Sequence, residues 1–210
     1  MKKLITAMVL LLCIPVLCSC SADSRQYGIL TGGRNSMQTD FSLFDKVCSA
    51  DEALALAKEN GVVVFDGMKL ISGGEVWDDF YARASGGKRA SVLCAYYYTL
   101  DKEHVSEELY EEEKDKYPQL YFYLLEYNGK TYTLTTRESG SETPDSAESY
   151  KYLAHYTGKP SSPYALFSEY DYYVLVDDPD VTWEDIERGM FSSQYGDWIR
   201  HSSVYTNTID

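Results

Sequence analysis

The chain has 210 residues and a formal net charge of −14, with 33 acidic residues against 19 lysines and arginines. Phosphate backbones and anionic lipid headgroups repel so acidic a protein, which excludes nucleic acid as a partner and favours a domain held away from a membrane surface. The composition also includes 20 tyrosines, an unusually high number. The length suits one domain with a sizeable core.

The N-terminus has the pattern of an export signal. Two lysines precede an almost wholly apolar run, residues 4–17, which has the length of a signal-peptide core and is short for a membrane span. The run ends in Leu17-Cys18-Ser19-Cys20, which resembles the lipobox of bacterial lipoproteins. The resemblance implies cleavage before Cys20 and acylation of Cys20 by chains such as palmitate, which hold a protein durably on a membrane. The alternative is an ordinary secretory signal that is cut one or two residues later.

These features divide the chain into three parts. We expect residues 1–19 to be a lipoprotein signal peptide and residues 20–40 to be a lipid-anchored flexible stalk, because the latter are rich in Ser, Gly, Asn and Asp. Residues 41–210 are expected to form a single α+β domain. The predicted location is the cell membrane, with the lipid in the bilayer and the domain on its extracytoplasmic face.

Capping patterns predict three helices in the domain. Ser49 with Glu52 forms a capping box at the start of a helix over residues 50–59. A second box, residues 72–75, is expected to begin a helix that ends at Gly86-Gly87. Thr182 is expected to cap the last helix.

Runs of β-branched and aromatic residues predict the strands. Asn128-Gly129 is the strongest hairpin signal. Residues 101–116 carry dense acidic charge around one Leu-Tyr pair, which indicates a solvated helix or a long loop. Together the elements predict an α+β fold, with an antiparallel sheet of five to six strands and about three helices. The expected strands are residues 62–65, 89–99, 119–127, 131–137, 149–157 and 170–177.

Several short segments in one order are similar to a known group of proteins. They are Asn60-Gly61-Val62-Val63-Val64, Gly67, Trp77-Asp78-Asp79-Phe80, Gly86-Gly87-Lys88-Arg89-Ala90-Ser91-Val92, Tyr97-Tyr98-Thr99 and Leu125-Glu126-Tyr127-Asn128-Gly129-Lys130. Over roughly residues 50–135 the chain resembles small lipoproteins of Gram-positive bacteria that are built on a domain of unknown function. The resemblance implies a location and a fold, and it supplies no activity. The acidic insert before Tyr117 and the tail after Arg137 depart from the pattern.

No motif indicates a catalytic residue, a cofactor or a metal site. Ser85-Gly86-Gly87-Lys88 has the Ser-x-x-Lys spacing of penicillin-recognising enzymes, but it ends a predicted helix, so a glycine cap is expected instead. Residues 177–185 concentrate carboxylates without the Gly and Glu positions of an EF-hand, which favours a plain turn before a helix. The alternative function is an extracytoplasmic hydrolase that uses His155 with an acid.

Two cysteines remain in the expected domain, Cys48 and Cys94. Outside the cytoplasm such a pair can form a disulfide. The alternative is two buried free thiols, which the apolar neighbours of both residues favour.

The many tyrosines could either pack in the core of the domain or line a surface that binds a ligand. A two-residue Asn128-Gly129 loop predicts that Leu125 lies opposite Tyr132, so the face with Tyr121, Tyr123 and Leu125 is expected to form the core. On the other face, either helices cover the apolar residues or these line a binding groove. The candidate ligand-binding residues are Phe122, Leu124, Tyr150, Tyr152 and Tyr156. The sequence therefore predicts a membrane-anchored binding or interaction module, with a cell-wall polysaccharide or a protein as the expected partner.

Overall fold

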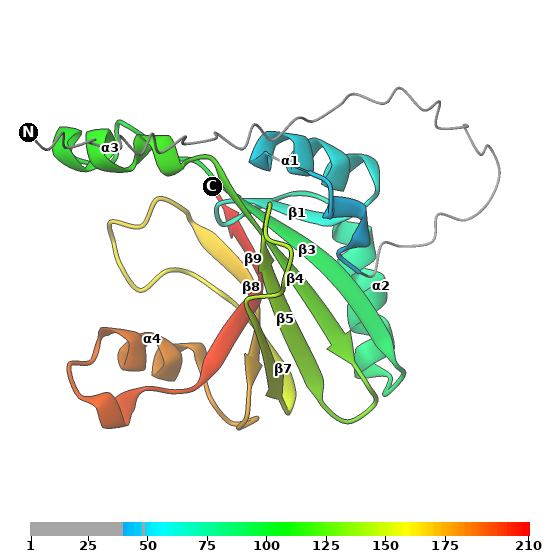
Figure 1. Ribbon diagram of the computed structural model, residues 1–210. Helices are drawn as coiled ribbons and strands as arrows, with labels where there is room; N and C mark the ends of the chain where they lie inside the picture. Colours follow the sequence, from blue (N-terminus) through cyan, green and yellow to red (C-terminus); the bar gives the residue numbers. More distant parts are fainter. Residues whose placement is uncertain (1–39, 48) are drawn as a thin grey trace, which may run out of the picture. The chain divides into compact units, whose positions relative to one another are not determined.

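The computed structural model describes residues 40–47 and 49–210, which belong to one structural unit (Figure 1). Within these residues the α-helices are α1 (Ala50–Glu59), α2 (Gly74–Ser85), α3 (Glu107–Glu113) and α4 (Trp183–Phe191). Short 3₁₀ turns are η1 (Ser42–Phe44), η2 (Lys114–Lys116) and η3 (Tyr195–Asp197). None of the described helices is both long enough and apolar enough to span a membrane.

The strands form two sheets. A six-stranded sheet has the order β2-β1-β3-β4-β5-β6, and a three-stranded sheet has the order β7-β8-β9. The bounds are β1 Val63–Asp66, β2 Lys69–Ser72, β3 Ala90–Tyr98, β4 Gln119–Tyr127, β5 Tyr132–Glu138, β6 Ser146–Tyr150, β7 Tyr152–Gly158, β8 Glu169–Val176 and β9 His201–Ile209.

The expected α+β class is confirmed, but the single antiparallel sheet is not. β1 and β3 pair in parallel, because α2 carries the chain back across the sheet between them, as parallel pairing requires. The strand expected over residues 149–157 is divided at Lys151. Its first part is β6 of the six-stranded sheet and its second part is β7 of the other sheet.

Helix α1 covers the outer face of the six-stranded sheet. Its expected cap is present, since Ser49 Oγ accepts a hydrogen bond from the Glu52 amide at 3.2 Å. The helix buries Ala53 and Ala57 against a cluster that includes Phe122, and η1 adds Phe44 to this cluster. Helices, and not a groove, therefore cover the second face of the predicted hairpin.

Arg137 fastens the start of the described chain to this face. Its side chain is buried and donates hydrogen bonds to Asp45 Oδ1 at 2.7 Å and to the Phe41 carbonyl at 2.9 Å. The guanidinium also lies over the Phe41 ring, 4.7 Å from its centroid. Residues 40–47 thus have a fixed place on the sheet.

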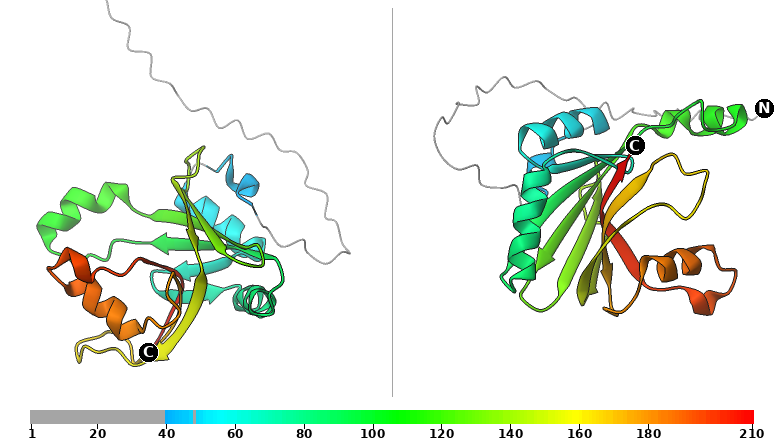
Figure 2. Two further views of the ribbon diagram at one scale, coloured as in Figure 1. Left: turned by 90° about the horizontal axis from the view of Figure 1, so that it is seen from below. Right: turned by 180° about the vertical axis from the view of Figure 1, so that it is seen from behind.

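Helix α2 packs against both sheets (Figure 2). Trp77 is buried, and its ring lies 5.1 Å from that of Tyr173 and 4.7 Å from that of Tyr205, both in the three-stranded sheet. Phe80 and Ala84 join the same core as Val92 and Leu125 of the six-stranded sheet. The inner faces of the two sheets therefore share one core.

Helix α4 covers the outer face of the three-stranded sheet. Ile186 is buried against Tyr172 and Val174, with Trp183 packed beside them. The expected cap of this helix is confirmed, because Thr182 and Asp185 form a reciprocal capping box.

The two sheets are tied along two sides. On one side a single residue, Lys151, separates β6 from β7. On the other side β9 reaches β2: the Thr208 amide donates to the Met68 carbonyl at 2.9 Å, and the Leu70 amide donates to Asn207 Oδ1 at 3.1 Å. These ties fix the spacing of the sheets around the space between them.

The start of α2 differs from the sequence prediction. Gly73, and not Ser72, is the N-cap, in the left-handed region at φ 79°, and the Ser72 hydroxyl is buried without a hydrogen-bond partner among the described residues. A Cβ on Gly73 would lie 2.6 Å from the Val62 carbonyl oxygen and 2.7 Å from Val63 Cα. Close packing of this turn on β1 therefore requires glycine.

We expect Gly73→Ala to lower the free energy of unfolding by about 3 kcal/mol, from backbone strain together with the overlap on β1. Gly87→Ala is the matched control, because Gly87 has a similar φ of 72° and open space around it. The control should cost about 1 kcal/mol, from backbone strain alone. Urea unfolding measures both, and equal losses would contradict the tight contact.

Candidate functional site

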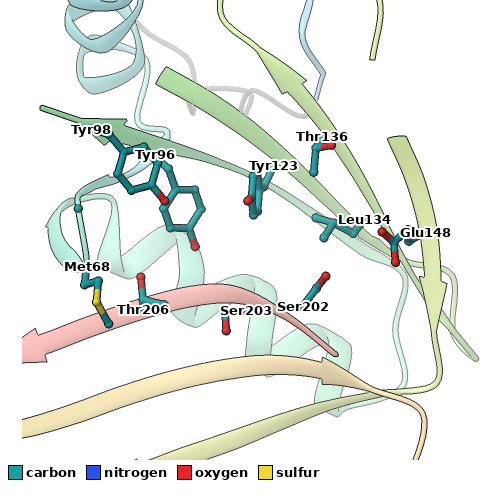
Figure 3. Close-up of a pocket in the computed structure, with 11 residues that line it drawn as sticks. Met68, Tyr96, Tyr98, Tyr123, Leu134, Thr136, Glu148, Ser202, Ser203 and Thr206 are labelled. Atoms are coloured by element: carbon teal, nitrogen blue, oxygen red, sulfur yellow. The ribbon is translucent and has the colours of Figure 1, made fainter. Parts of the chain in front are cut away.

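A cleft of about 390 Å³ lies between the two sheets (Figure 3). One wall comes from β3, β4, β5 and β6, the other comes from β9, and the β1–β2 turn closes one end. Its lining residues are Gly67, Met68, Tyr96, Tyr98, Tyr123, Leu134, Thr136, Glu148, Ser202, Ser203 and Thr206.

Three tyrosines form much of the first wall. Tyr96 and Tyr98 alternate along β3 and so share its inner face, and Tyr123 of β4 lies beside them. The Tyr96 ring packs on Phe65 at 4.6 Å and on Tyr123 at 4.7 Å. With its ring held in this way, Tyr96 points its hydroxyl toward β9 on the cleft side of the sheet, where this oxygen is buried (Figure 3).

The second wall belongs to β9. The hydroxyls of Ser202 and Thr206 point toward the tyrosines (Figure 3). The pairing of β8 with β9 shifts between Tyr173 and Val174, which leaves Val204 as an extra residue of β9. This bulge interrupts the alternation, so Val204 and Tyr205 both reach the shared core.

A polar network fixes one end of the cleft. Glu148 Oε2 accepts hydrogen bonds from Tyr150 Oη at 2.7 Å and from Arg200 Nη2 at 3.2 Å. Arg200 also pairs with Asp177 at 2.6 Å, and Tyr150 Oη lies 3.0 Å from Ser202 Oγ. The network joins β6 to β9 and pairs the Glu148 carboxylate with an arginine that it shares with Asp177.

The hydroxyl of Tyr96 is buried and, within the described part of the chain, has no hydrogen-bond partner of good geometry. Burial raises the pKa of Tyr96 well above its usual value, and the nearby Thr206 hydroxyl offsets this rise in part. Burial also raises the pKa of Tyr98 to about 12 and that of Tyr123 above its usual value. All three hydroxyls therefore stay protonated at neutral pH, where each can both donate and accept.

The residues predicted from the sequence to bind a ligand do not form this site. Phe122 and Tyr150 are buried, so their predicted contact with a ligand is wrong. Leu124 packs into the α1 cluster, and the Tyr156 hydroxyl donates to the Val181 carbonyl at 2.7 Å beneath α4. Tyr152 is exposed on β7, away from the cleft lining.

The hairpin register is also wrong by two residues. Tyr127, and not Leu125, lies opposite Tyr132. Asn128 closes a longer loop, since its Oδ1 accepts from the amides of Lys130 at 2.9 Å and Thr131 at 3.1 Å. Because side chains alternate with a period of two, a shift of two leaves the predicted faces unchanged.

The sequence prediction missed β9 and with it Ser202, Ser203 and Thr206. The signal was present, because residues 204–209 are rich in β-branched and aromatic side chains. Strand β9 lies after the last predicted helix, where no further element was expected.

Cys94 and His155 are not among the residues that line the cleft. Cys94 is a free, buried thiol whose pKa is raised by burial. Cys48 and the lipidation candidate Cys20 lie outside the described residues, as does the predicted signal peptide.

His155 forms a pair with an acid. Its Nε2 lies 2.7 Å from Asp171 Oδ1, and its ring stacks on Tyr173 at 4.1 Å. Among the described residues no hydroxyl or thiol is hydrogen-bonded to His155. Asp171 could orient His155 as a general base, but no described nucleophile is hydrogen-bonded to the histidine. Stacking on Tyr173 accounts for the position of the His155 ring.

No protein-family model, curated protein or solved structure matches the chain. The geometry of the site is therefore the basis for function.

We expect the domain to lose stability between about pH 10 and about pH 12. The pKa values of Tyr98, Tyr132 and Tyr173 are each raised to about 12 in the folded protein, first of all by burial. In this range the unfolded chain, with ordinary tyrosine pKa values, has already lost protons that the folded state keeps. Urea unfolding across this range, with ultraviolet titration of tyrosinate, measures the effect. Titration of every tyrosine near pH 10 without loss of stability would contradict it.

Proposed function

We propose that the protein is a membrane-anchored extracytoplasmic lipoprotein and that its domain is a binding module with its ligand in the tyrosine cleft. The observation that carries the binding role is the buried Tyr96 hydroxyl, which points toward β9 and makes no hydrogen bond of good geometry to the described residues, although the Thr206 hydroxyl lies near it. A buried polar group without a partner costs stability, and a ligand that supplies one regains it. Tyr96 differs from the other buried hydroxyls without a bonded partner, Ser72 and Tyr172, because it lies in the wall of a cleft.

The size and the lining of the cleft support the same role. Its volume of about 390 Å³ lies within the range of about 300–1,000 Å³ that is typical of small-molecule sites. Polar groups converge on it from both sheets, and the ties at Lys151 and between β2 and β9 hold the two walls at a set distance. The site is thus formed before the ligand arrives, which lowers the cost of binding.

The anchor in this proposal rests on the N-terminal sequence. The apolar run and Leu17-Cys18-Ser19-Cys20 resemble a lipoprotein signal, and two or three acyl chains hold a protein durably on a bilayer. Residues 20–40 provide the spacer between the lipid and the domain. The resemblance to Gram-positive lipoproteins supports the same location.

To test the anchor, the full chain is expressed in a bacterium that lipidates exported proteins and is labelled with a palmitate analogue. We expect label and membrane association for the unchanged chain and for the control Cys18→Ala, since both keep Cys20. Cys20→Ala should carry no label, because the acylated thiol is gone. An unlabelled unchanged chain, or a labelled Cys20→Ala variant, would refute the anchor.

An extracytoplasmic hydrolase is the alternative, and the His155–Asp171 pair is the one observation in its favour. To separate the two, a chemically mixed library is added to the full chain while the ring signals of labelled tyrosines are followed by NMR. We expect to find a compound that shifts the ring signals of Tyr98 and Tyr123 but not those of Tyr172. This compound should be recovered chemically unchanged after incubation with the unchanged chain and with the His155→Gln variant. Turnover that His155→Gln abolishes would establish the hydrolase, and a library without any cleft ligand would contradict the binding role.

A further inference from the structure

The cleft is lined mainly by hydroxyl groups. Three belong to tyrosines of the six-stranded sheet, and Ser202 and Thr206 of β9 point two more toward them (Figure 3). The Thr136 hydroxyl also belongs to a lining residue, but it is already hydrogen-bonded to Ser146 Oγ at 2.8 Å. A hydroxyl donates one hydrogen bond and accepts others, so it suits a partner that does both. The remaining lining includes Leu134 and Met68, which offer apolar surface beside the hydroxyls.

An anionic ligand does not fit this lining. Neither lysine nor arginine is among the described residues that line the cleft, and its one charged side chain is the carboxylate of Glu148. Arg200 is close to that carboxylate but is already paired with Glu148 and Asp177. The net charge of −14 repels an anion further.

A quaternary ammonium ligand finds no open ring face on Tyr96. Such ligands are held against the faces of aromatic rings. The Tyr96 ring is instead packed against Phe65 and Tyr123, and its hydroxyl points toward β9. Glu148, the carboxylate that would attract a cation, already accepts hydrogen bonds from Tyr150 and Arg200.

We infer that the ligand is a neutral saccharide, with the Tyr96 hydroxyl as its buried anchor and the hydroxyls of Ser202 and Thr206 on the opposite wall. This inference rests on the proposed function and names its ligand class. Sugar hydroxyls donate and accept as the lining does, and the C–H groups of a sugar ring match Leu134 and Met68. The volume is near the lower end of the usual range, which suits a monosaccharide or disaccharide unit.

The test uses the full chain in a detergent without a sugar headgroup and follows its labelled tyrosine rings by NMR. Glucose, N-acetylglucosamine and their disaccharides are the neutral probes. Glucuronic acid is the matched anionic probe, because it differs from glucose by one carboxylate, and tetramethylammonium is the cationic probe. We expect the neutral sugars to shift Tyr98 and Tyr123, and the charged probes to leave both unshifted.

Tyr96→Phe tests the anchor. This variant keeps the packed ring and removes the hydroxyl, so the melting temperature should stay the same or rise. The affinity for the neutral sugar should fall about tenfold, from the loss of one buried hydrogen bond. Tyr172→Phe is the matched control, because the Tyr172 hydroxyl is also buried without a partner but belongs to the core beneath α4. It should leave the affinity unchanged.

The outcomes separate the inference from the function on which it rests. If neutral sugars bind in the cleft, and if Tyr96→Phe weakens this binding while Tyr172→Phe leaves it unchanged, both the inference and the proposed function are supported. Cleft binding by only a charged probe or another member of the mixed library overturns the saccharide and leaves the binding module. Equal affinity for Tyr96→Phe overturns the anchor. Absence of any cleft ligand among all compounds overturns the inference and the function together.

Discussion

The structure depends on the way in which tyrosine fills the core between the two sheets. A tyrosine ring packs as an apolar body, but its hydroxyl needs a hydrogen-bond partner. Tyr150 meets this need through Glu148 and Ser202, which join β6 to β9. Tyr96 meets it poorly, since only the nearby Thr206 hydroxyl acts on it and no hydrogen bond of good geometry forms among the described residues, and Tyr96 lies in the wall of the cleft. One residue type thus builds both the core and the opening in it.

The rest of the fold holds this arrangement in place. Helix α2 packs between the sheets through Trp77, while α1 and α4 cover the outer faces and leave the inner faces to each other. The link at Lys151 and the β2–β9 contacts join the two sheets that carry the walls of the cleft. The hydroxyl groups of this space, with a single carboxylate that shares one arginine with Asp177, are the basis of the proposal that it binds a neutral polar ligand. A tether at the N-terminus would hold such a site at the cell surface.

Local signals in the sequence were sufficient for several elements. Ser49 caps α1 and the capping box at Thr182 begins α4, as expected. These starts were predictable because the capping side chains lie within a few residues of the backbone amides that they bond. The core face of the hairpin was correct despite the wrong register, since alternation survives a shift of two. The site itself was not predictable in this way. One wall comes from β3, β4, β5 and β6 and the other from residues 202–206 of β9. The pairing of β9 with β8 and its contact with β2 bring these distant segments together. Phe122 was misassigned because the chain pattern does not tell which face a distant helix will cover.

A crystal structure of the full chain, grown with and without N-acetylglucosamine, tests the central claim most directly. The account predicts an open cleft with an ordered water, or a sugar oxygen when the sugar is present, within hydrogen-bond distance of Tyr96 Oη. Sheets that close on each other, with a protein group bonded to Tyr96 Oη and sugar absent from the cleft, would contradict it.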